Sequence, residues 1–175
     1  MYEGKLVRLR EFRAEDAAVC VTWLNDIDTA TKLSGGAPMP QTLEAEREWL
    51  SRAGDRNFAV ETRAGAFIGT CGFFDLSDQS RSCSVGWMIG DKTARGKGYG
   101  TEMIELLLQY LFIRRNLERV ALKVFAYNEG AVRLYERMGF VREAIYREQA
   151  YSMGRYWDEY GYSMLKGEYL ARYGD

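Results

Sequence analysis

Histidine is absent from the 175 residues of this sequence. Its absence excludes a Ser–His or Cys–His catalytic pair, a zinc site of the HExxH type and histidine as a general base. Any chemistry that the protein performs has to use carboxylates, tyrosine, lysine, arginine, water or backbone groups. No other feature of the composition restricts the function as strongly.

Cysteine and long apolar runs are also scarce. The chain has three cysteines, Cys20, Cys71 and Cys83, without the spacing of a metal site, and we expect buried, reduced thiols rather than a reactive nucleophile. The N-terminal segment MYEGKLVRLREF lacks the apolar core of a signal peptide, and no stretch reaches the apolar length that spans a bilayer. We therefore expect a cytoplasmic protein without a membrane partner.

An excess of charge of either sign is missing as well. Lys and Arg number 24 against 25 Asp and Glu, for a formal net charge of -1. This balance gives no reason to expect nucleic acid or an anionic membrane as a partner. Apolar residues make up 47%, and a chain of this length can bury the core of one ordinary domain, so we expect a single domain over residues 1–175.

Hydrophobic periodicity predicts a mixed α/β domain. We expect helices where apolar residues recur at helical spacing or follow a capping signal, at 13–26, 42–53, 98–116 and 128–140. We expect strands in the alternating or apolar runs, at 5–12, in a hairpin over 57–76, at 82–90, at 118–127, and in a pair over 141–166 around a Ser-Met-Gly turn. Both prolines lie in SGGAPMP (34–40), which predicts a loop.

Three glycines alternate with other residues in RGKGYG (95–100), between an expected strand and the longest expected helix. The string lacks the spacing of a P-loop, and it departs from the GxGxxG spacing of a dinucleotide-binding turn. A glycine loop before a long helix does present backbone N–H groups at the positive end of the helix dipole, which suits a pyrophosphate. Arg95 and Lys97 add positive charge. The alternative is a simple glycine turn with a solvated basic pair.

Two motifs, in this order, resemble those of the GNAT superfamily of N-acetyltransferases. RGKGYG at 95–100 resembles the Q/R-x-x-G-x-G/A signature, and NEGAVRLYERMGF at 128–140 resembles N-x-x-A-x-x-L-Y-x-x-x-G-F. The phrases LVRLREFRAEDA, TWLND and MGRYWDEYGYSML are similar to the branch that contains ribosomal-protein and spermidine acetyltransferases. The resemblance implies a GNAT fold of the α/β (α+β) class, with a mixed central sheet of about seven strands flanked by about four helices.

The resemblance also implies acetyl-CoA as co-substrate and no metal. The glycine loop would bind the pyrophosphate, and the backbone of the preceding strand would bind the pantetheine arm in the manner of an added strand. Asn128 would bond the arm as well as capping its helix. The implied cofactor-binding residues are Trp87, Met88, Ile89, Arg95, Gly96, Lys97, Gly98, Tyr99, Gly100, Thr101 and Asn128.

Tyr135 is the residue that the resemblance implies as general acid for the departing thiolate. It follows Asn128 by seven residues, or about two helical turns, so both share one face of the expected helix. A phenol with a pKa of about 10 is protonated at neutral pH and can donate a proton. A core tyrosine packed on the sheet is the alternative. Gly86 lies in the strand where a bulge would turn a backbone N–H toward the developing oxyanion.

The general base stays unassigned. Ser84 stands where many relatives carry a glutamate, and a serine could order a water but not act as a base unaided. Asp75 and Glu148 are the other candidates, and a solvated surface carboxylate is the alternative for each.

The acceptor pocket is the least defined part of the expected site. Trp23, Asn25, Asp26 and Phe74 are candidate walls, and acidic groups there would favour a cationic amine. The C-terminal aromatic residues would form either an amine-binding cage or a mixture of core and homodimer interface. These residues are Tyr146, Tyr151, Tyr156, Trp157, Tyr160, Tyr162, Tyr169 and Tyr173.

We therefore expect direct acetyl transfer, in a ternary complex, to a primary amine of a small molecule or peptide. Polyamine, protein N-terminal, amino-acid and aminoglycoside acceptors all stay open, because one fold serves many substrates. A non-catalytic regulator that binds acyl-CoA is the alternative from a different class.

Overall fold

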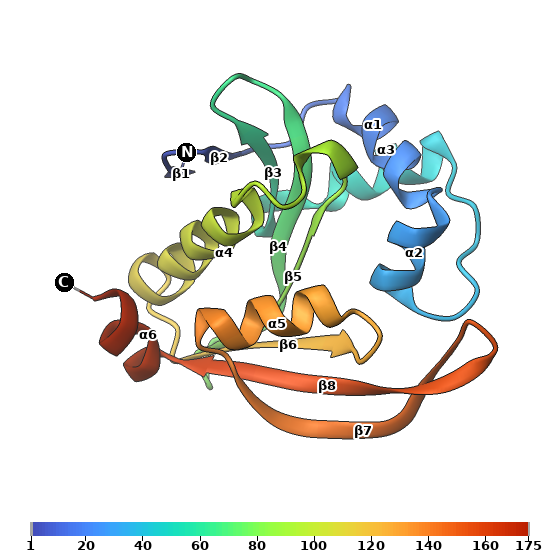
Figure 1. The fold of residues 1–175 in the computed structure, drawn as a ribbon. Coiled ribbons are helices and arrows are strands. Elements are labelled where there is room, and N and C mark those ends of the chain that lie inside the picture. Colours follow the sequence, from blue (N-terminus) through green and yellow to red (C-terminus); the bar gives the residue numbers. More distant parts are fainter. Residues whose placement is uncertain (1, 175) are drawn as a thin grey trace. The chain divides into compact units, whose positions relative to one another are not determined.

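The protein is described by a computed structural model that covers residues 2–174 (Figure 1). Its eight strands are hydrogen-bonded in the order β1-β2-β3-β4-β5-β6-β8-β7, in a mixed sheet with β5 and β6 parallel. The strands are β1 (Tyr2–Glu3), β2 (Val7–Arg10), β3 (Asn57–Thr62), β4 (Phe67–Ser77), β5 (Ser82–Ile89), β6 (Arg119–Phe125), β7 (Val141–Ser152) and β8 (Arg155–Leu165). The α-helices are α1 (Asp16–Leu24), α2 (Ile27–Ser34), α3 (Leu43–Arg52), α4 (Tyr99–Gln109), α5 (Glu129–Met138) and α6 (Lys166–Tyr173).

The mixed α/β class is confirmed, with slightly more elements than expected. Residues 2–174 form eight strands rather than seven and six α-helices rather than four. The additional strand is the two-residue β1, and the additional helices are α2 and α6. The sequence IDTATKLS of α2 contains few apolar residues, and Asp26 caps this helix because its side chain accepts the N–H of Thr29. In α6, the side chain of Glu168 accepts the N–H of Leu165 at 2.8 Å.

The helix expected over 98–116 ends earlier than its apolar pattern predicts. Regular α-helix stops at Gln109, and a wider π-helical turn, η3, follows over Tyr110–Arg114. There the N–H of Arg115 bonds to the carbonyl of Tyr110, five residues back, at 2.9 Å. The strand pair around Ser-Met-Gly is confirmed, since Met153 and Gly154 both have positive φ, as a tight hairpin turn requires.

The chain divides into two compact units. Unit 1 comprises the chain up to Gly72 together with Gly86–Leu107, and unit 2 comprises Phe73–Val85 together with the chain from Leu108 onward. The expectation of a single domain over residues 1–175 stays a prediction.

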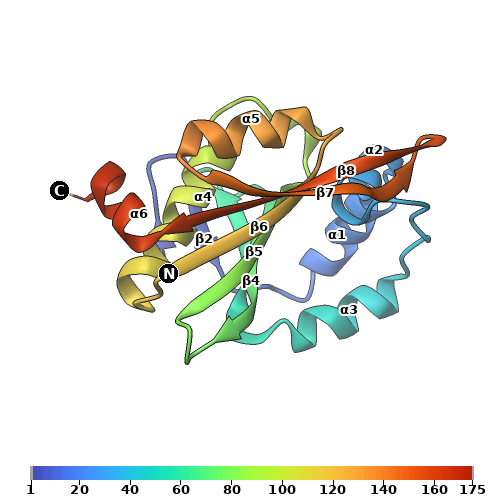
Figure 2. The ribbon, with the colours of Figure 1, turned by 90° about the horizontal axis from the view of Figure 1, so that it is seen from below.

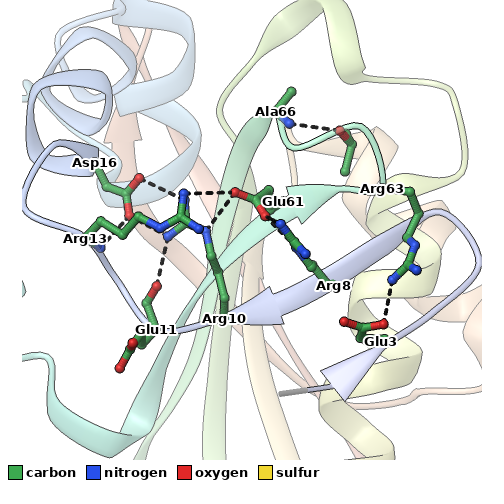
Figure 3. Close-up of polar contacts among 10 residues, drawn as sticks. Glu3, Arg8, Arg10, Glu11, Arg13, Asp16, Glu61, Arg63 and Ala66 are labelled. Carbon is green, nitrogen blue, oxygen red and sulfur yellow. Dashed lines mark hydrogen bonds and ion pairs between the residues drawn. The ribbon is translucent and has the colours of Figure 1, made fainter.

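Unit 1 contains a buried network of charged side chains (Figure 3). The guanidinium of Arg10, on β2, donates to both carboxylate oxygens of Asp16 at 2.7 and 2.9 Å, and its Nε donates to Glu61 at 3.0 Å. These three residues are 3%, 3% and 1% exposed, respectively. Arg8 and Arg13 also donate to Glu61. Because Asp16 begins α1 and Glu61 lies in β3, the network ties that helix to two strands.

The network fixes the charge state of its two carboxylates. Burial by itself would raise the pKa of Asp16, but hydrogen bonds from Arg10 and from the N–H of Arg13 outweigh it and hold the pKa below the ordinary value. Burial opposes ionisation of Glu61 as well, and the hydrogen bonds from Arg8 and Arg10 lower its pKa. Both side chains are therefore ionised at neutral pH.

Unit 2 is built on β6, β7 and β8. β6 pairs in parallel with the start of β5 and antiparallel with β8 along its whole length. Figure 2 shows the hairpin of β7 and β8 along its length, with α6 continuing from the end of β8. The core includes the fully buried Phe112, Val120 and Tyr162. α5 stops at Gly139, whose φ of 93° is left-handed, and this confirms the expected end of that helix.

Replacing Glu61 with glutamine should lower the free energy of unfolding by about 2 kcal/mol, because the buried Arg10 would lose one of its two carboxylate partners and the more exposed Arg8 and Arg13 would lose a carboxylate partner as well. Urea denaturation at pH 7, followed by tryptophan fluorescence, measures this loss. Glu48→Gln is the matched control, since Glu48 forms an ion pair with Arg52 in which both side chains are largely exposed. The control should unfold like the wild type. Equal midpoints for all three proteins would show that the network adds no stability.

The same variant should alter the response to acid. Because the folded-state pKa values of Asp16 and Glu61 lie below the ordinary values of 3.8 and 4.5, their stabilising contribution is present above those ordinary values. It is lost as the pH falls through the folded-state values. The wild type should therefore lose unfolding free energy below about pH 4 more steeply than Glu61→Gln, which lacks one of the two titrating groups.

Candidate functional site

The end of β5 is held tightly against β4 within unit 1. The carbonyl of Ile68 accepts two N–H groups, from Gly90 at 2.9 Å and from Asp91 at 3.2 Å. A Cβ at Gly69 would stand 2.2 Å from the carbonyl oxygen of Met88, and one at Gly90 would stand 2.1 Å from the Trp23 ring. Glycine is therefore required at both positions for the backbone to pack this closely.

The other edge of β5 is only partly used by β6. The parallel ladder pairs Ser82–Ser84 with Arg119–Ala121 and ends there, whereas β5 continues to Ile89. Trp87, Met88 and Ile89, which were expected to bond the pantetheine arm through their backbone, all lie beyond the end of this ladder. All three side chains are half-buried.

The glycine loop follows a short 3₁₀ turn, η2 (Lys92–Ala94), which Asp91 caps by accepting the N–H of Thr93 at 2.8 Å. Gly96 and Gly98 then have φ of 76° and 85°, in the left-handed region that residues with a Cβ rarely adopt. A Cβ at Gly96 would meet nothing within 4 Å, and the nearest atom to one at Gly98 is Leu6 Cδ1 at 3.4 Å. Backbone conformation requires these two glycines, and the space beside Gly96 is open.

Gly100 differs from the two preceding glycines. It lies in the first turn of α4, outside the positive-φ region, and a Cβ there would lie 3.7 Å from Ile89 Cγ1, an ordinary contact. The packing of this chain therefore admits alanine, the residue that the family signature also allows. The loop, exposed from Arg95 to Gly98 and followed by the N-terminus of an eleven-residue helix, fits a diphosphate bound by backbone N–H groups.

Besides adding positive charge, Arg95 makes hydrogen bonds within the protein. Its Nε donates to the carbonyl of Ile89 at 3.0 Å, and its Nη2 donates to the hydroxyl of Thr29 at 3.1 Å. The side chain therefore connects the start of the loop to β5 and to α2. Lys97 is exposed, as expected for a residue at the rim.

Two further residues of unit 1 organise this region and were missed by sequence reasoning. Glu102, in the first turn of α4, accepts the backbone N–H groups of three consecutive residues, Lys5–Val7, at 2.7 to 2.8 Å. The hydroxyl of Thr29 accepts a hydrogen bond from Arg95, which lies 66 positions later in the sequence. The Asp-x-x-Thr pattern at 26–29 is a local signal that could have indicated a helix start, but nothing in the sequence indicated the long-range partners of Glu102 or Thr29.

The remaining predicted residues lie in unit 2, on α5. Asn128 occupies the cap position, and its carbonyl accepts the N–H groups of Ala131 and Val132. Its side chain makes no cap hydrogen bond, so the predicted side-chain cap is wrong. Tyr135 is 8% exposed, and its ring packs edge-on against Phe140 and Tyr162, with centroids 6.0 and 6.2 Å apart. The structure thus places the glycine-loop residues in unit 1 and both α5 residues in unit 2.

The candidate bases have distinct settings. Ser84 is half-buried at the end of the β5–β6 ladder. Asp75 and Glu148 are exposed, with left-handed φ of 50° and 51°, which is uncommon outside glycine. Glu148 lies in a bulge of β7, and its N–H donates to Asp158 at 2.9 Å. The bulge borders a hollow of about 800 Å³ in unit 2, lined by Tyr146, Arg147, Glu148, Gln149 and Asp158.

Most C-terminal aromatic rings already contact other groups of unit 2. Tyr162 and Tyr169 are buried, with Tyr169 stacked on Phe112 at 4.9 Å. The rings of Tyr146, Tyr160 and Trp157 each have a cationic side chain of the same chain over one face, from Lys123, Arg142 and Arg155. These contacts favour a packing role over an empty cage for an amine. Of the expected acceptor walls, Phe74 is 51% exposed. Asn25 bonds the backbone of Gln41, and Asp26 caps α2.

The three cysteines are buried and unpaired, as expected. Burial is the main cause that raises the pKa of Cys20 and of Cys83 to about 12, and it raises the pKa of Cys71 as well. None of these thiols is ionised at neutral pH. Within residues 2–174, no cluster of three or more acidic or cysteine side chains is arranged to hold a metal ion. Over the same residues, no helix is both long and apolar enough to cross a membrane.

Comparison with known proteins identifies the family. Residues 7–141 match the family model described as "Acetyltransferase (GNAT) domain". The chain belongs to the GNAT family of acetyltransferases. An uncharacterized N-acetyltransferase of Bacillus subtilis is 34% identical over 90% of this GNAT chain and 92% of its own. The spermidine N(1)-acetyltransferase of Vibrio cholerae is 33% identical over 67% of this chain and 68% of its own.

Solved structures agree with this assignment. The spermidine N-acetyltransferase from Vibrio cholerae, in complex with CoA and spermine, has a TM-score of 0.85 and 26% sequence identity, over 95% of this chain and 99% of its own. This GNAT protein is therefore an acetyl-CoA-dependent N-acetyltransferase, with acetyl-CoA as its co-substrate. The left-handed glycines at the start of α4 fit that co-substrate.

Alanine substitutions at Gly98 and Gly100 should affect this GNAT protein very differently. Alanine at position 98 disfavours the left-handed backbone by roughly 1–2 kcal/mol, so the loop of the free variant would leave that conformation. Binding of CoA would then have to supply the free energy that restores it. We expect Gly98→Ala to weaken CoA binding about tenfold. Gly100→Ala, where the Cβ has room, should stay within about twofold of the wild type. Isothermal titration calorimetry measures both affinities, and equal values would contradict the assigned role of the loop.

Proposed function

We propose that this acetyltransferase transfers the acetyl group of acetyl-CoA to a primary amine by direct attack in a ternary complex, and that the acceptor is a small polyamine-like cation. The observation that carries the proposal is the loop at 95–101, in which two left-handed glycines precede the N-terminus of α4. The family assignment supplies the acetyl donor, and the geometry of unit 1 says how the chain would hold it.

The loop would hold the diphosphate with backbone N–H groups. Left-handed φ at alternate residues turns successive N–H groups toward a common centre, a geometry that binds anions. The helix dipole of α4 adds positive potential at the same end, and Lys97 adds a mobile charge from the exposed rim. Because these donors belong mostly to the backbone, only substitutions that change its conformation or crowd it would be strongly harmful.

The backbone of β5 would hold the pantetheine arm. β5 continues from Ser84 to Ile89 beyond the end of its ladder with β6, which supports pairing with an extended ligand through Trp87–Ile89. An N–H near Gly86 would donate to the developing oxyanion of the acetyl carbonyl. The carbonyl of Ile89 is already engaged by Arg95, so the ligand would use the groups that precede it.

Tyr135 would act as the general acid that protonates the departing thiolate of CoA. Its position in the NEGAVRLYERMGF motif supports this role. A tyrosine hydroxyl is protonated at neutral pH and donates to a thiolate without a preceding ionisation step. The amine must lose a proton before it attacks. We assign no residue to that step, because Ser84 is not a base and both Asp75 and Glu148 are exposed carboxylates.

Direct attack is favoured over an acetylated enzyme. A thioester intermediate on the protein would need an ionisable cysteine. All three cysteines are buried, and burial raises the pKa of each one. The acetyl group would therefore pass from CoA to the amine in one complex that holds both substrates.

A polyamine-like acceptor is supported by the relatives. One similar protein is named as a spermidine N(1)-acetyltransferase, and a similar solved structure contains spermine. The acceptor assay is a measurement of free-thiol release from acetyl-CoA with a panel of spermidine, spermine, amino acids, an aminoglycoside and N-terminal peptides. We expect spermidine or spermine to give the highest kcat/KM. A higher value for a peptide or an aminoglycoside would refute the acceptor class, and calorimetric CoA binding without any turnover would favour a non-catalytic CoA-binding regulator.

Tyr135→Phe should lower kcat by about 100-fold or more while the Kd for CoA stays within about twofold, because the acid acts in the transition state. Tyr162→Phe is the matched control. Tyr162 is also buried in unit 2, but its hydroxyl donates to Glu136 at 2.8 Å, and burial with that bond raises its pKa to about 12. The control should lose stability and keep its turnover. A Tyr135→Phe enzyme with wild-type kcat would remove Tyr135 from the mechanism.

A further inference from the structure

A chain of hydrogen bonds runs from the start of α2 to the start of the glycine loop, within unit 1. The hydroxyl of Thr29 donates to Asp26 Oδ1 at 3.0 Å and accepts from Arg95 Nη2 at 3.1 Å. Arg95 Nε then donates to the carbonyl of Ile89 at 3.0 Å. Thr29 is 3% exposed, so its hydroxyl is shielded from water and its two partners are defined. Arg95 is thereby fixed at both ends of its guanidinium.

A second contact ties the same two segments together. Asp26 Oδ2 accepts from Lys92 Nζ at 2.8 Å, and Lys92 belongs to the 3₁₀ turn that precedes Arg95. The hydrogen bond from Lys92 and that from the N–H of Thr29 lower the pKa of Asp26 to about 2. Asp26 is therefore a carboxylate across the neutral range. It connects to the loop segment once directly, through Lys92, and once through Thr29 and Arg95.

The loop needs such support because its own residues make few contacts that would hold its conformation. From Arg95 to Gly98 the chain is exposed, and glycine is the residue with the most conformational freedom to lose. A Cβ at Gly96 would contact nothing, so the space beside that residue is open. Just before the glycines, the backbone N–H of Arg95 donates to the carbonyl of Lys92 at 3.3 Å, and its guanidinium adds two further hydrogen bonds, to Ile89 and Thr29. Whatever orients Arg95 therefore reduces the conformational cost of binding at the loop.

We propose that Thr29 is a positioning residue for co-substrate binding, acting through Arg95 on the glycine loop. The inference rests on the proposed role of this loop in holding the diphosphate. Thr29 itself contacts no part of the loop between Gly96 and Gly100 in any hydrogen bond, so its effect is on loop order and not on direct recognition. The hydroxyl is the part of Thr29 that orients Arg95, because it hydrogen-bonds both Asp26 and Arg95.

The test compares Thr29→Val with Thr29→Ser, in the whole 175-residue chain. Valine keeps the branched shape and removes the hydroxyl, whereas serine keeps the hydroxyl. We expect Thr29→Val to raise the KM for acetyl-CoA and the calorimetric Kd for CoA about tenfold, the typical effect of losing a hydrogen bond to a charged group. kcat should change less than about twofold, since chemistry after binding is unaffected. Thr29→Ser should restore both constants.

Thr22→Val is the control for loss of a threonine hydroxyl. Thr22 lies on α1 in the same unit, is exposed, and donates only to the carbonyl of Val19. Its variant should bind CoA like the wild type. Thermal unfolding of all variants separates a loss of affinity from a loss of fold. Affinity at the wild-type level in a folded Thr29→Val enzyme would overturn the inference, and so would failure of Thr29→Ser to restore binding.

A double-mutant cycle with Arg95→Met tests the route of the effect. If Thr29 acts through Arg95, valine at position 29 should have no further effect on the Kd for CoA once Arg95 is gone. Additive effects would overturn the route. Failure of the proposed function is distinguishable from failure of this inference, because in the former case the wild-type enzyme itself would not bind CoA.

Discussion

The carbonyl oxygen of Ile68 accepts the N–H groups of both Gly90 and Asp91. The position of the glycine loop and of α4 depends on this pair of hydrogen bonds. It halts β5 against β4 and turns the chain away from the sheet. Asp91 then caps the short 3₁₀ turn, and the glycine loop and α4 follow from it. Gly69 and Gly90 leave no room for a Cβ, so the backbone packs closely against its neighbours here. The loop is thus exposed along its own residues but anchored where it begins.

An enzyme without histidine has to draw its catalytic groups from elsewhere, and in the proposed function most of them come from the main chain. Backbone N–H groups serve both the anion and the arm of the co-substrate in the proposed function. Side chains have a supporting role, in which Arg95 and Thr29 order the loop and Glu102 holds Lys5–Val7 beside the first turn of α4. The one side chain assigned a chemical step in the proposed function is the phenol of Tyr135, which carries its proton at neutral pH.

The sequence predicted those parts of the structure that depend on local rules. A glycine loop before α4 followed from RGKGYG, although its left-handed φ values did not, and the β7–β8 turn followed from Ser-Met-Gly and the end of α5 from Gly139. Helix α2 was missed because only three of its eight residues are apolar and because it is stabilised by a cap and by Lys92 and Arg95, 66 positions away. The side-chain cap by Asn128 was wrong, since the same residue type serves either a cap or a ligand and spacing does not distinguish them. The base stays unassigned for a similar reason, because a carboxylate on an exposed bulge has no local signature of its function.

The bulge in β7 also interrupts an edge strand of the sheet. β7 is the last strand of the sheet, twelve residues long, and such an edge would ordinarily offer a template on which another chain could add a strand. Here the ladder to β8 is interrupted between Tyr146 and Ala150, and Glu148 adopts a left-handed backbone in the middle of the interruption. Arg147 and Glu148 place charges at the same point. The irregularity that borders the hollow of unit 2 thus also makes this part of a long edge, with its charges, a poorer template for an added strand than a regular strand would be.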